Sequence, residues 1–349
     1  MILPHSFTAA ILLLVASFVC LGSWAALFKW TGKAWRFELF YYDFGVGAIL
    51  LAVVAAYTLG TLGSDLSFSD RMMVAGHTAQ AMLVAAGFLF NLGNMLLLAC
   101  VSLTGMAVAF PLSIGVALLV SSFWNFHAEN FFLLVAAIIL LLASAIVSSA
   151  AARLRAAARL RARLAAKPRP KTDSKRNPQP LKARRTSKGI FTGVLGGILM
   201  GLVPPLAHRG MGGEFGLGGY AAMLMFAIGI IVSTIFFNFY FVNISIEGGP
   251  IGFKAYFRGT PGQHFLGFAS GALLVLGLLC ALLARSVPRT AGVDPALLTA
   301  IPVASVFLAV FWGLAAWKEF AKPSSGARPA LAIALLLFAG GLALFSISV

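Results

Sequence analysis

Ten runs of apolar residues dominate the sequence, and each is about as long as a helix that crosses a bilayer. They cover residues 7–29, 40–60, 73–100, 105–124, 131–150, 189–207, 218–242, 264–284, 295–317 and 329–347. A membrane-spanning helix needs about 20 such residues, and backbone groups in lipid must bond within their own segment. We therefore predict an all-α integral membrane protein with ten transmembrane helices. The run at 73–100 is long enough to tilt or to break near Gly93.

Basic residues are concentrated between the fifth and sixth runs. Residues 153–188 hold 14 of the 26 Lys and Arg residues and one acid, Asp173. The stretch "RLRAAARLRARLAA" predicts a short basic helix at the membrane surface, and the Pro-rich stretch after it predicts an unpacked linker. A nucleic-acid-binding arm is the alternative; we favour a cytoplasmic linker on anionic lipids, with no nucleic-acid partner. The chain thus divides into a first half (1–150), a linker (151–188) and a second half (189–349).

The same charges predict the orientation in the membrane. With the linker in the cytoplasm, 22 basic residues lie on that side, while Arg71, Arg209, Arg285 and Arg289 lie on the other. Loops rich in Lys and Arg stay in the cytoplasm. We therefore expect a multi-pass protein of the cell (inner) membrane, with both termini outside and residues 151–188 cytoplasmic.

Five helices on each side of the linker predict two repeats of inverted topology, because an odd number of spans reverses the second half. The stretches "AFPLSIGVALLVSSFW" and "AIPVASVFLAVFWGLAAW" echo each other weakly and place Pro111 and Pro302 near their starts. A proline kinks a helix, so each is interpreted either as a hinge or as an ordinary membrane proline. In the sixth run, Pro204 and Pro205 are expected to end or bend the helix. Before these prolines, every fourth residue of the same run is a glycine, at Gly189, Gly193, Gly197 and Gly201. This glycine ridge predicts close packing against another helix.

No catalytic or cofactor motif is readable. The stretch "TGKA" lacks the glycine and hydroxyl residue of a nucleotide-binding loop. The five histidines are scattered without the spacing of a metal site, and the three cysteines lie inside apolar runs. We expect no cofactor, no metal and no enzymatic activity, with a non-transporting membrane enzyme or scaffold as the alternative.

Several charges fall at the predicted cytoplasmic ends of helices. Lys29, Asp43 and Glu319 end or begin the first, second and ninth runs, and Glu247 and Lys254 follow the seventh. Ionisable residues near membrane depth are candidates for function. We hypothesise a cytoplasmic gate in which Asp43 pairs with Lys29 or Lys254; charges at headgroup level are the alternative.

The deeper polar side chains are amides. Asn91 and Asn94 share one face of the third helix, Asn238 lies in the seventh, and Asn125 lies near the end of the fourth. An amide both donates and accepts hydrogen bonds, which suits a neutral substrate with N–H and C=O groups. Hydrogen bonds between helices are the alternative for each residue.

Several stretches resemble the ureide permease family of the drug/metabolite transporter superfamily. The first half contributes "CLGSWAALFKW", "FELFYYDFGVGAIL" and "FLFNLGNMLLLACVSLTGMAVAFPLSIGVALLVSSFWNF". The second contributes "EGGPIGFKAYFRGTPGQHFLGFASGA" and "AIPVASVFLAVFWGLAAWKEF". This family is similar in plan to glucose/ribose porters. The resemblance implies ten helices with a long central loop in the cytoplasm. It also implies proton-coupled transport of neutral, nitrogen-rich heterocycles such as allantoin and uracil.

The resemblance places five residues at positions of the family pattern: Asp43, Lys254, Tyr256, Trp312 and Glu319. The chain departs from the plant members in two respects. It has no Walker-like motif in the central loop, and the eighth run has no amide side chains. We therefore expect a bacterial relative whose substrate can differ from theirs.

Together these features predict a secondary active transporter for a small polar metabolite, with its site between two inverted halves. We expect Trp24, Asn91, Asn94, Asn238 and Trp312 to bind a planar, neutral nitrogen-rich heterocycle such as a ureide or nucleobase. Lys29, Asp43, Lys254, Tyr256 and Glu319 are expected to gate or couple transport, and Pro111 and Pro302 to act as hinges. A sugar porter or an exporter of the same superfamily is the alternative, and a homodimer is left open.

Overall fold

The computed structural model describes residues 1–32, 35–63, 66–124, 130–165, 178–213, 215–243, 249, 252–321 and 326–348, without the side chains of 163–165 and 178–184. Every regular element in these residues is helical. The elements are α1 (Phe7–Trp30), α2 (Phe37–Tyr57), α3 (Phe68–Val74), α4 (His77–Thr104), α5 (Met106–Ser122), α6 (Phe131–Ala165), α7 (Pro178–Gly201), α8 (Val203–Met211), α9 (Gly219–Asn243), η1 (Phe253–Arg258), α10 (Pro261–Ala284), η2 (Arg289–Ala291), α11 (Pro295–Ala315) and α12 (Ala327–Ser348).

Each predicted apolar run forms a helix. In the described residues, nine helical stretches are long and apolar enough to cross a membrane. The remaining run forms α5, which has 17 residues and is shorter than the roughly 20 that a full crossing takes. The chain is therefore an all-helical, multi-span membrane protein, with α5 as a short helix inside the bundle.

Some boundaries differ from the predicted runs. α4 passes Gly93 without a break, and the interruption lies at Ala75 and Gly76, between α3 and α4. α6 continues to Ala165, so the basic stretch prolongs a membrane helix and does not form a separate surface helix. Ala, Leu and Arg all favour helix, which is the physical reason for this continuity. The predicted boundary at residue 150 consequently lies inside α6.

The second half begins with a broken helix, as the two prolines predict. α7 starts at Pro178, inside the predicted linker, and ends at Gly201. α8 starts at Val203, directly before Pro204 and Pro205. The prediction that these prolines end or bend the helix is confirmed. Residues 166–177 of the linker lie outside the described residues.

The stretch before α10 contains a clear start signal. Thr260 accepts a hydrogen bond from the backbone of Gln263, whose side chain bonds back to the backbone of Thr260. Pro261 occupies the first helical turn. This capping box starts α10 three residues before the predicted run, and "FKAYFR" directly upstream forms the 3-10 helix η1.

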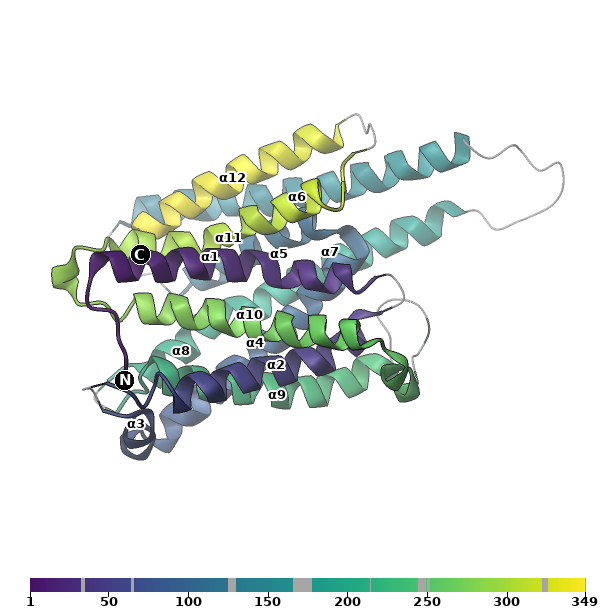
Figure 1. Cartoon of the computed structure of the whole chain (residues 1–349). Coiled ribbons are helices and arrows are strands. Elements are labelled where there is room, and N and C mark those ends of the chain that lie inside the picture. Colours follow the sequence, from purple (N-terminus) through teal and green to yellow (C-terminus); the bar gives the residue numbers. More distant parts are fainter. Residues whose placement is uncertain are drawn as a thin grey trace.

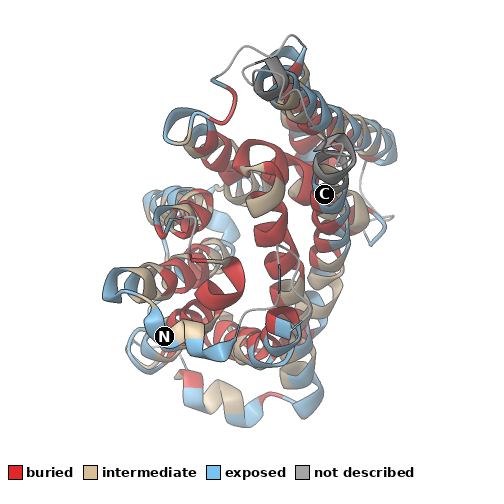
Figure 2. Cartoon of the chain, turned by 90° about the vertical axis from the view of Figure 1, so that its right-hand side faces the viewer, coloured by how far each residue is buried: buried red, intermediate tan, exposed pale blue. Residues whose placement is uncertain are grey.

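The long helices lie side by side along one common direction (Figure 1). α6 and α7 extend from the bundle toward the linker, and we call this end the linker end. Both chain termini lie at the opposite end (Figure 1), as the predicted topology requires. An end-on view shows buried residues on the inward faces of the helices and exposed residues outside (Figure 2).

Most helix contacts join the two halves. α1 packs against α10 and α11, α2 against α9 and α10, and α4 against α7 and α9. α5 packs against α6, α7 and α11, and α12 packs against α6 and α11. The predicted glycine ridge on α7 faces α4 and α5, which confirms its role in packing.

Two of these helix pairs cross at glycines. A side chain on Gly47 would meet the carbonyl of Phe268, and one on Gly271 would meet the carbonyl of Phe44, where α2 crosses α10. Backbones approach this closely only where both helices lack a side chain.

The crossing of α4 and α9 has the same form. A side chain on Gly87 would meet the carbonyl of Phe226, and one on Gly229 would meet the carbonyl of Val84. In both crossings each glycine faces the carbonyl that comes three residues before its partner glycine. All four glycines are the eleventh residue of their helices.

Candidate functional site

Two clusters of charged and aromatic side chains lie at the linker end, and three buried amides lie between helices near them, two of them bonded to Glu38 and Tyr41 of α2, which precede Asp43. Both clusters join the first half of the chain to the second.

The first cluster surrounds Glu319, in the segment between α11 and α12. Its carboxylate pairs with Lys29 at the end of α1 and accepts bonds of 3.0 Å each from the backbone N–H groups of Met106 and Ala107. These groups begin α5, where the helix dipole favours a negative charge. Gly105, with φ of +97°, leaves room for the carboxylate. Glu319 is thus held by both an ion pair and a helix end.

Arginines of α6 complete this first cluster. Arg155 Nη1 lies 3.7 Å from Glu319 Oε2, and Arg159 donates a 2.8 Å bond to the Glu319 carbonyl. The Lys29 ammonium lies 5.1 Å from the ring centre of Trp317, which adds a cation–π contact. Sequence reasoning assigned Arg155 to the linker, whereas the continuous helix α6 carries it into the bundle.

The second cluster surrounds Asp43 of α2. The Tyr256 hydroxyl of η1 donates a 2.6 Å bond to Asp43 Oδ1. His264 Nδ1 of α10 lies 2.9 Å from Asp43 Oδ2, and the His264 ring packs edge-on against Trp35 at 5.1 Å. Asp43 is 8% exposed, so these partners replace most of its water.

The predicted pairing of Asp43 with a lysine is wrong in this structure. Among the described residues, Asp43 is bound by Tyr256 and His264, Lys29 is bound to Glu319, and Lys254 is exposed. The cause is the turn of η1, which brings Tyr256 rather than Lys254 to α2. Glu247 and Asn125 lie outside the described residues.

The phenol of Tyr256 is kept neutral by its surroundings. Partial burial raises its pKa well above the usual value, and the hydrogen bond to Asp43 raises the pKa further. A neutral phenol keeps the proton that it donates to the carboxylate. Tyr256 therefore acts as a stable hydrogen-bond donor to Asp43 at ordinary pH.

The predicted amides are buried and bonded between helices. Asn91 of α4 donates a 3.0 Å bond to Thr234 of α9, and Asn238, one turn further along α9, donates a 2.7 Å bond to the carbonyl of Glu38. Asn94 donates a 2.9 Å bond to the Tyr41 hydroxyl. The side-chain oxygens of Asn91 and Asn238 are buried without a hydrogen-bond partner in the described part of the chain.

The two predicted tryptophans lie in different surroundings. Trp24 is 2% exposed and packs against Phe44 at 5.7 Å and Phe110 at 6.2 Å. Phe44 also contacts Tyr41 at 4.7 Å, so Trp24 is linked to the amides through aromatic rings.

Trp312, in contrast, lies closer to the Glu319 cluster. Its ring packs against Trp30 at 5.7 Å, and its N–H donates a 3.1 Å bond to Ser23. The structure therefore groups the three amides with Trp24 and sets Trp312 at the neighbouring linker-end cluster.

The predicted hinge prolines lie within continuous helices. Pro111 is in α5 and Pro302 is in α11, and these two helices pack against each other. Each proline removes one backbone N–H from its helix. Both α5 and α11 therefore contain a point at which the helix bends more easily.

Known proteins show distant similarity to this chain. No family model matches the chain. The chain is 24% identical over 135 residues to Ureide permease 4 of Arabidopsis thaliana, a match that covers 37% of this chain and 34% of that protein. It thus aligns with about a third of this relative's length. A solved structure described as "Crystal structure of protein" superposes over 98% of both chains, with a TM-score of 0.52 and 15% identity, which shows a shared fold alone.

Proposed function

We propose that this chain is a secondary active transporter, in which two inverted five-helix halves move against each other and give alternating access to a central site. The observation that carries the proposal is the pair of matched glycine crossings. Inverted repeats exchange α2 with α9 and α10 with α4, so they turn the α2–α10 crossing into the α9–α4 crossing. The same contact geometry at the same helix position supports this relation.

The smaller contacts α6–α7 and α5–α12 have no counterpart of similar extent among the described residues, but the more extensive helix contacts follow the same exchange. It takes α1–α10 into α7–α4 and α1–α11 into α7–α5, and it takes α5–α6 into α11–α12. The pairs α2–α9, α5–α11 and α6–α12 map onto themselves. Contacts between halves that come in related pairs favour rocking of one half on the other.

For the substrate we propose a small neutral molecule with N–H donors, such as a ureide or nucleobase. The side-chain oxygens of Asn91 and Asn238 are buried acceptors without a donor, and an unpaired buried polar atom costs about 1–3 kcal/mol. A ligand N–H would remove that cost, and Trp24 offers a ring for stacking. The aligned relative is by name a ureide permease, which is consistent with such a substrate.

We propose that the clusters around Glu319 and Asp43 act as gates at the linker end. Each joins the two halves, through Lys29 with Glu319 and through Asp43 with Tyr256 and His264. Opening the linker end by rocking would separate these partners. Lys254, the remaining proposed gate residue, is exposed and lies in the same 3-10 helix as Tyr256.

Flux into proteoliposomes tests the function. Allantoin, uracil, glucose and a cationic dye are compared as substrates, with and without a pH gradient. We expect uptake of a heterocycle, increased by the gradient if protons are coupled. Uptake of glucose alone would favour a sugar porter, dye extrusion would favour an exporter, and the absence of any protein-dependent flux would overturn the proposal.

A further inference from the structure

We propose a binding site for one anionic phospholipid in the groove between α11 and α12 at the linker end. The groove has a volume of about 380 Å³. Its walls are mainly apolar and its one charged residue is Arg328, with the lining formed by Leu314, Phe320, Ala321, Arg328, Leu331, Ala332 and Leu335.

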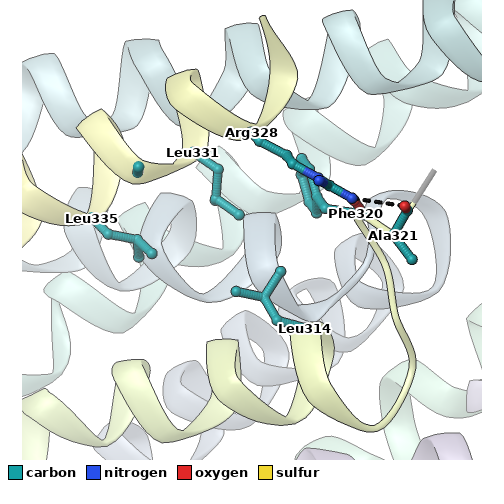
Figure 3. A pocket seen from close by; sticks show the side chains of 7 residues that line it. Leu314, Phe320, Ala321, Arg328, Leu331 and Leu335 are labelled. Atoms are coloured by element: carbon teal, nitrogen blue, oxygen red, sulfur yellow. Dashed lines mark hydrogen bonds between the residues drawn. The ribbon is translucent and has the colours of Figure 1, made fainter. Parts of the chain in front are cut away.

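The shape of the groove fits an acyl chain. Leu331 and Leu335 point from α12 toward Leu314 of α11, across the open space (Figure 3). Residues 328, 331, 332 and 335 share one face of α12, because they are separated by three or four positions. The groove therefore runs along α12 from its first turn into the membrane-spanning part.

Incomplete packing explains why the groove exists. α11 and α12 contact each other less extensively than α5 and α6, the corresponding pair of the first half. Ala332 faces the groove with a single methyl group, and Leu314 keeps 38% of its surface exposed. Since the groove lies on membrane-spanning helices, a lipid tail is the apolar molecule available to fill it.

Arg328 stands where the headgroup would lie. α12 begins at Ala327, so Arg328 is in the first turn, at the end of the span. Its guanidinium donates 2.7 Å bonds to the carbonyls of Phe320 and Ala321, as Figure 3 shows for the second contact. These two carbonyls are its hydrogen-bond partners among the described residues, and no described carboxylate pairs with it.

Neighbouring charges favour an anionic headgroup. Arg155 lies 4.8 Å from the ring centre of Phe320, which also lines the groove, and Arg159 binds the carbonyl of Glu319. Three guanidinium groups thus surround a segment whose described acid is Glu319. Basic pockets between helices on the cytoplasmic side attract anionic lipid headgroups.

The test compares lipids that differ in the headgroup alone. The purified full chain is mixed with phosphatidylglycerol and phosphatidylcholine of identical acyl chains, and bound lipid is measured by native mass spectrometry and by the shift of the melting temperature. We expect preferential retention of one phosphatidylglycerol, together with a higher melting temperature.

Two variants separate headgroup from tail. Arg328→Gln should weaken phosphatidylglycerol retention about fivefold, as loss of one basic residue near a charged headgroup implies. Ala332→Phe should fill the groove and reduce retention of the lipid while leaving Arg328 in place. The matched controls are Arg289→Gln, at the opposite end of the bundle, and Ile333→Phe, which is 50% exposed on the same helix; neither should change retention.

Four results would overturn the site. Equal retention of both lipids by the unmodified chain would remove the headgroup preference. A melting shift of the same size with inorganic phosphate would show that the anion acts without a tail. An unchanged Ala332→Phe variant would exclude the groove, and an Arg289→Gln loss equal to that of Arg328→Gln would show general charge attraction.

Discussion

Gly47 and Gly271 are reciprocal: each lies against the backbone carbonyl that comes three residues before the other. The contact joins α2 of the first half to α10 of the second, and Gly87 and Gly229 repeat it between α4 and α9. Close backbone contact of this kind tolerates no side chain. A substitution at one of these glycines therefore tests directly how the two halves of the chain meet.

Gly271→Ala should lower the free energy of unfolding of the protein in detergent by about 1–3 kcal/mol, the typical cost of overpacking a tight contact. The added methyl group would collide with the carbonyl of Phe44. Gly262→Ala is the matched control on the same helix, since open space surrounds that position. Melting followed by fluorescence measures both, and equal melting temperatures would contradict the crossing.

Glu319→Gln should destabilise the linker end. The substitution keeps an oxygen for the N–H groups of α5 but removes the charge that pairs with Lys29 and Arg155. Removal of one partner of a buried ion pair lowers the free energy of unfolding by about 3 kcal/mol or more. We expect the lower value here, because Lys29 keeps 18% of its side chain exposed.

A double-mutant cycle measures this coupling. Lys29→Met combined with Glu319→Gln should cost less than the sum of the two single changes, because the double variant no longer leaves the Lys29 charge without its Glu319 partner. Lys318→Gln, at an exposed neighbouring lysine, is the control and should be neutral. Strict additivity of the two changes would argue against a coupled pair.

Tyr256→Phe should destabilise the protein at neutral pH, with an effect that shrinks at high pH. The raised pKa of Tyr256 means that the unfolded chain loses the phenolic proton first, near pH ~10. Stability from this group is complete below that pH and is lost as the pH rises above it. The difference in melting temperature between the two proteins should stay constant from pH 7 to ~10 and begin to narrow above pH ~10, as the pH rises toward the raised pKa of the folded state. A difference that does not narrow above pH ~10 would exclude the neutral phenol as the cause.

Asn94→Ala and Trp24→Ala should reduce uptake of the substrate, since both lie in the buried cluster proposed to bind it. Asn243→Ala is the matched control, because Asn243 is exposed at the end of α9 and bonds to its own helix. Uptake is compared at equal amounts of folded protein in the vesicles. Unchanged transport by both variants would remove this site.

Cysteine labelling tests the orientation. Cys20, Cys100 and Cys280 are buried, so an impermeant thiol reagent should find little background. A cysteine at exposed Arg289 should react in intact cells, whereas one at exposed Lys254 should react after permeabilisation. The reverse pattern would place the linker end outside.

The helices were predictable because a membrane imposes a length and an apolar composition on each span. The ends of α6 and α7 were not, since basic residues inside a helix look the same as basic residues in a linker. His264 was dismissed as isolated because its partner, Asp43, is 221 residues away in the sequence. The capping threonine Thr260 marks the start of α10 but does not indicate a partner for His264, so the sequence held no local signal of this contact.

The sequence alone determined that this protein spans a membrane many times and which polar side chains lie among apolar ones. The tertiary structure decided the partners: Glu319 for Lys29, His264 and Tyr256 for Asp43, and one glycine for another. The apolar composition of a segment decides by itself whether that segment enters the bilayer as a helix. Pairing depends on how distant helices pack, and no local pattern encodes that arrangement.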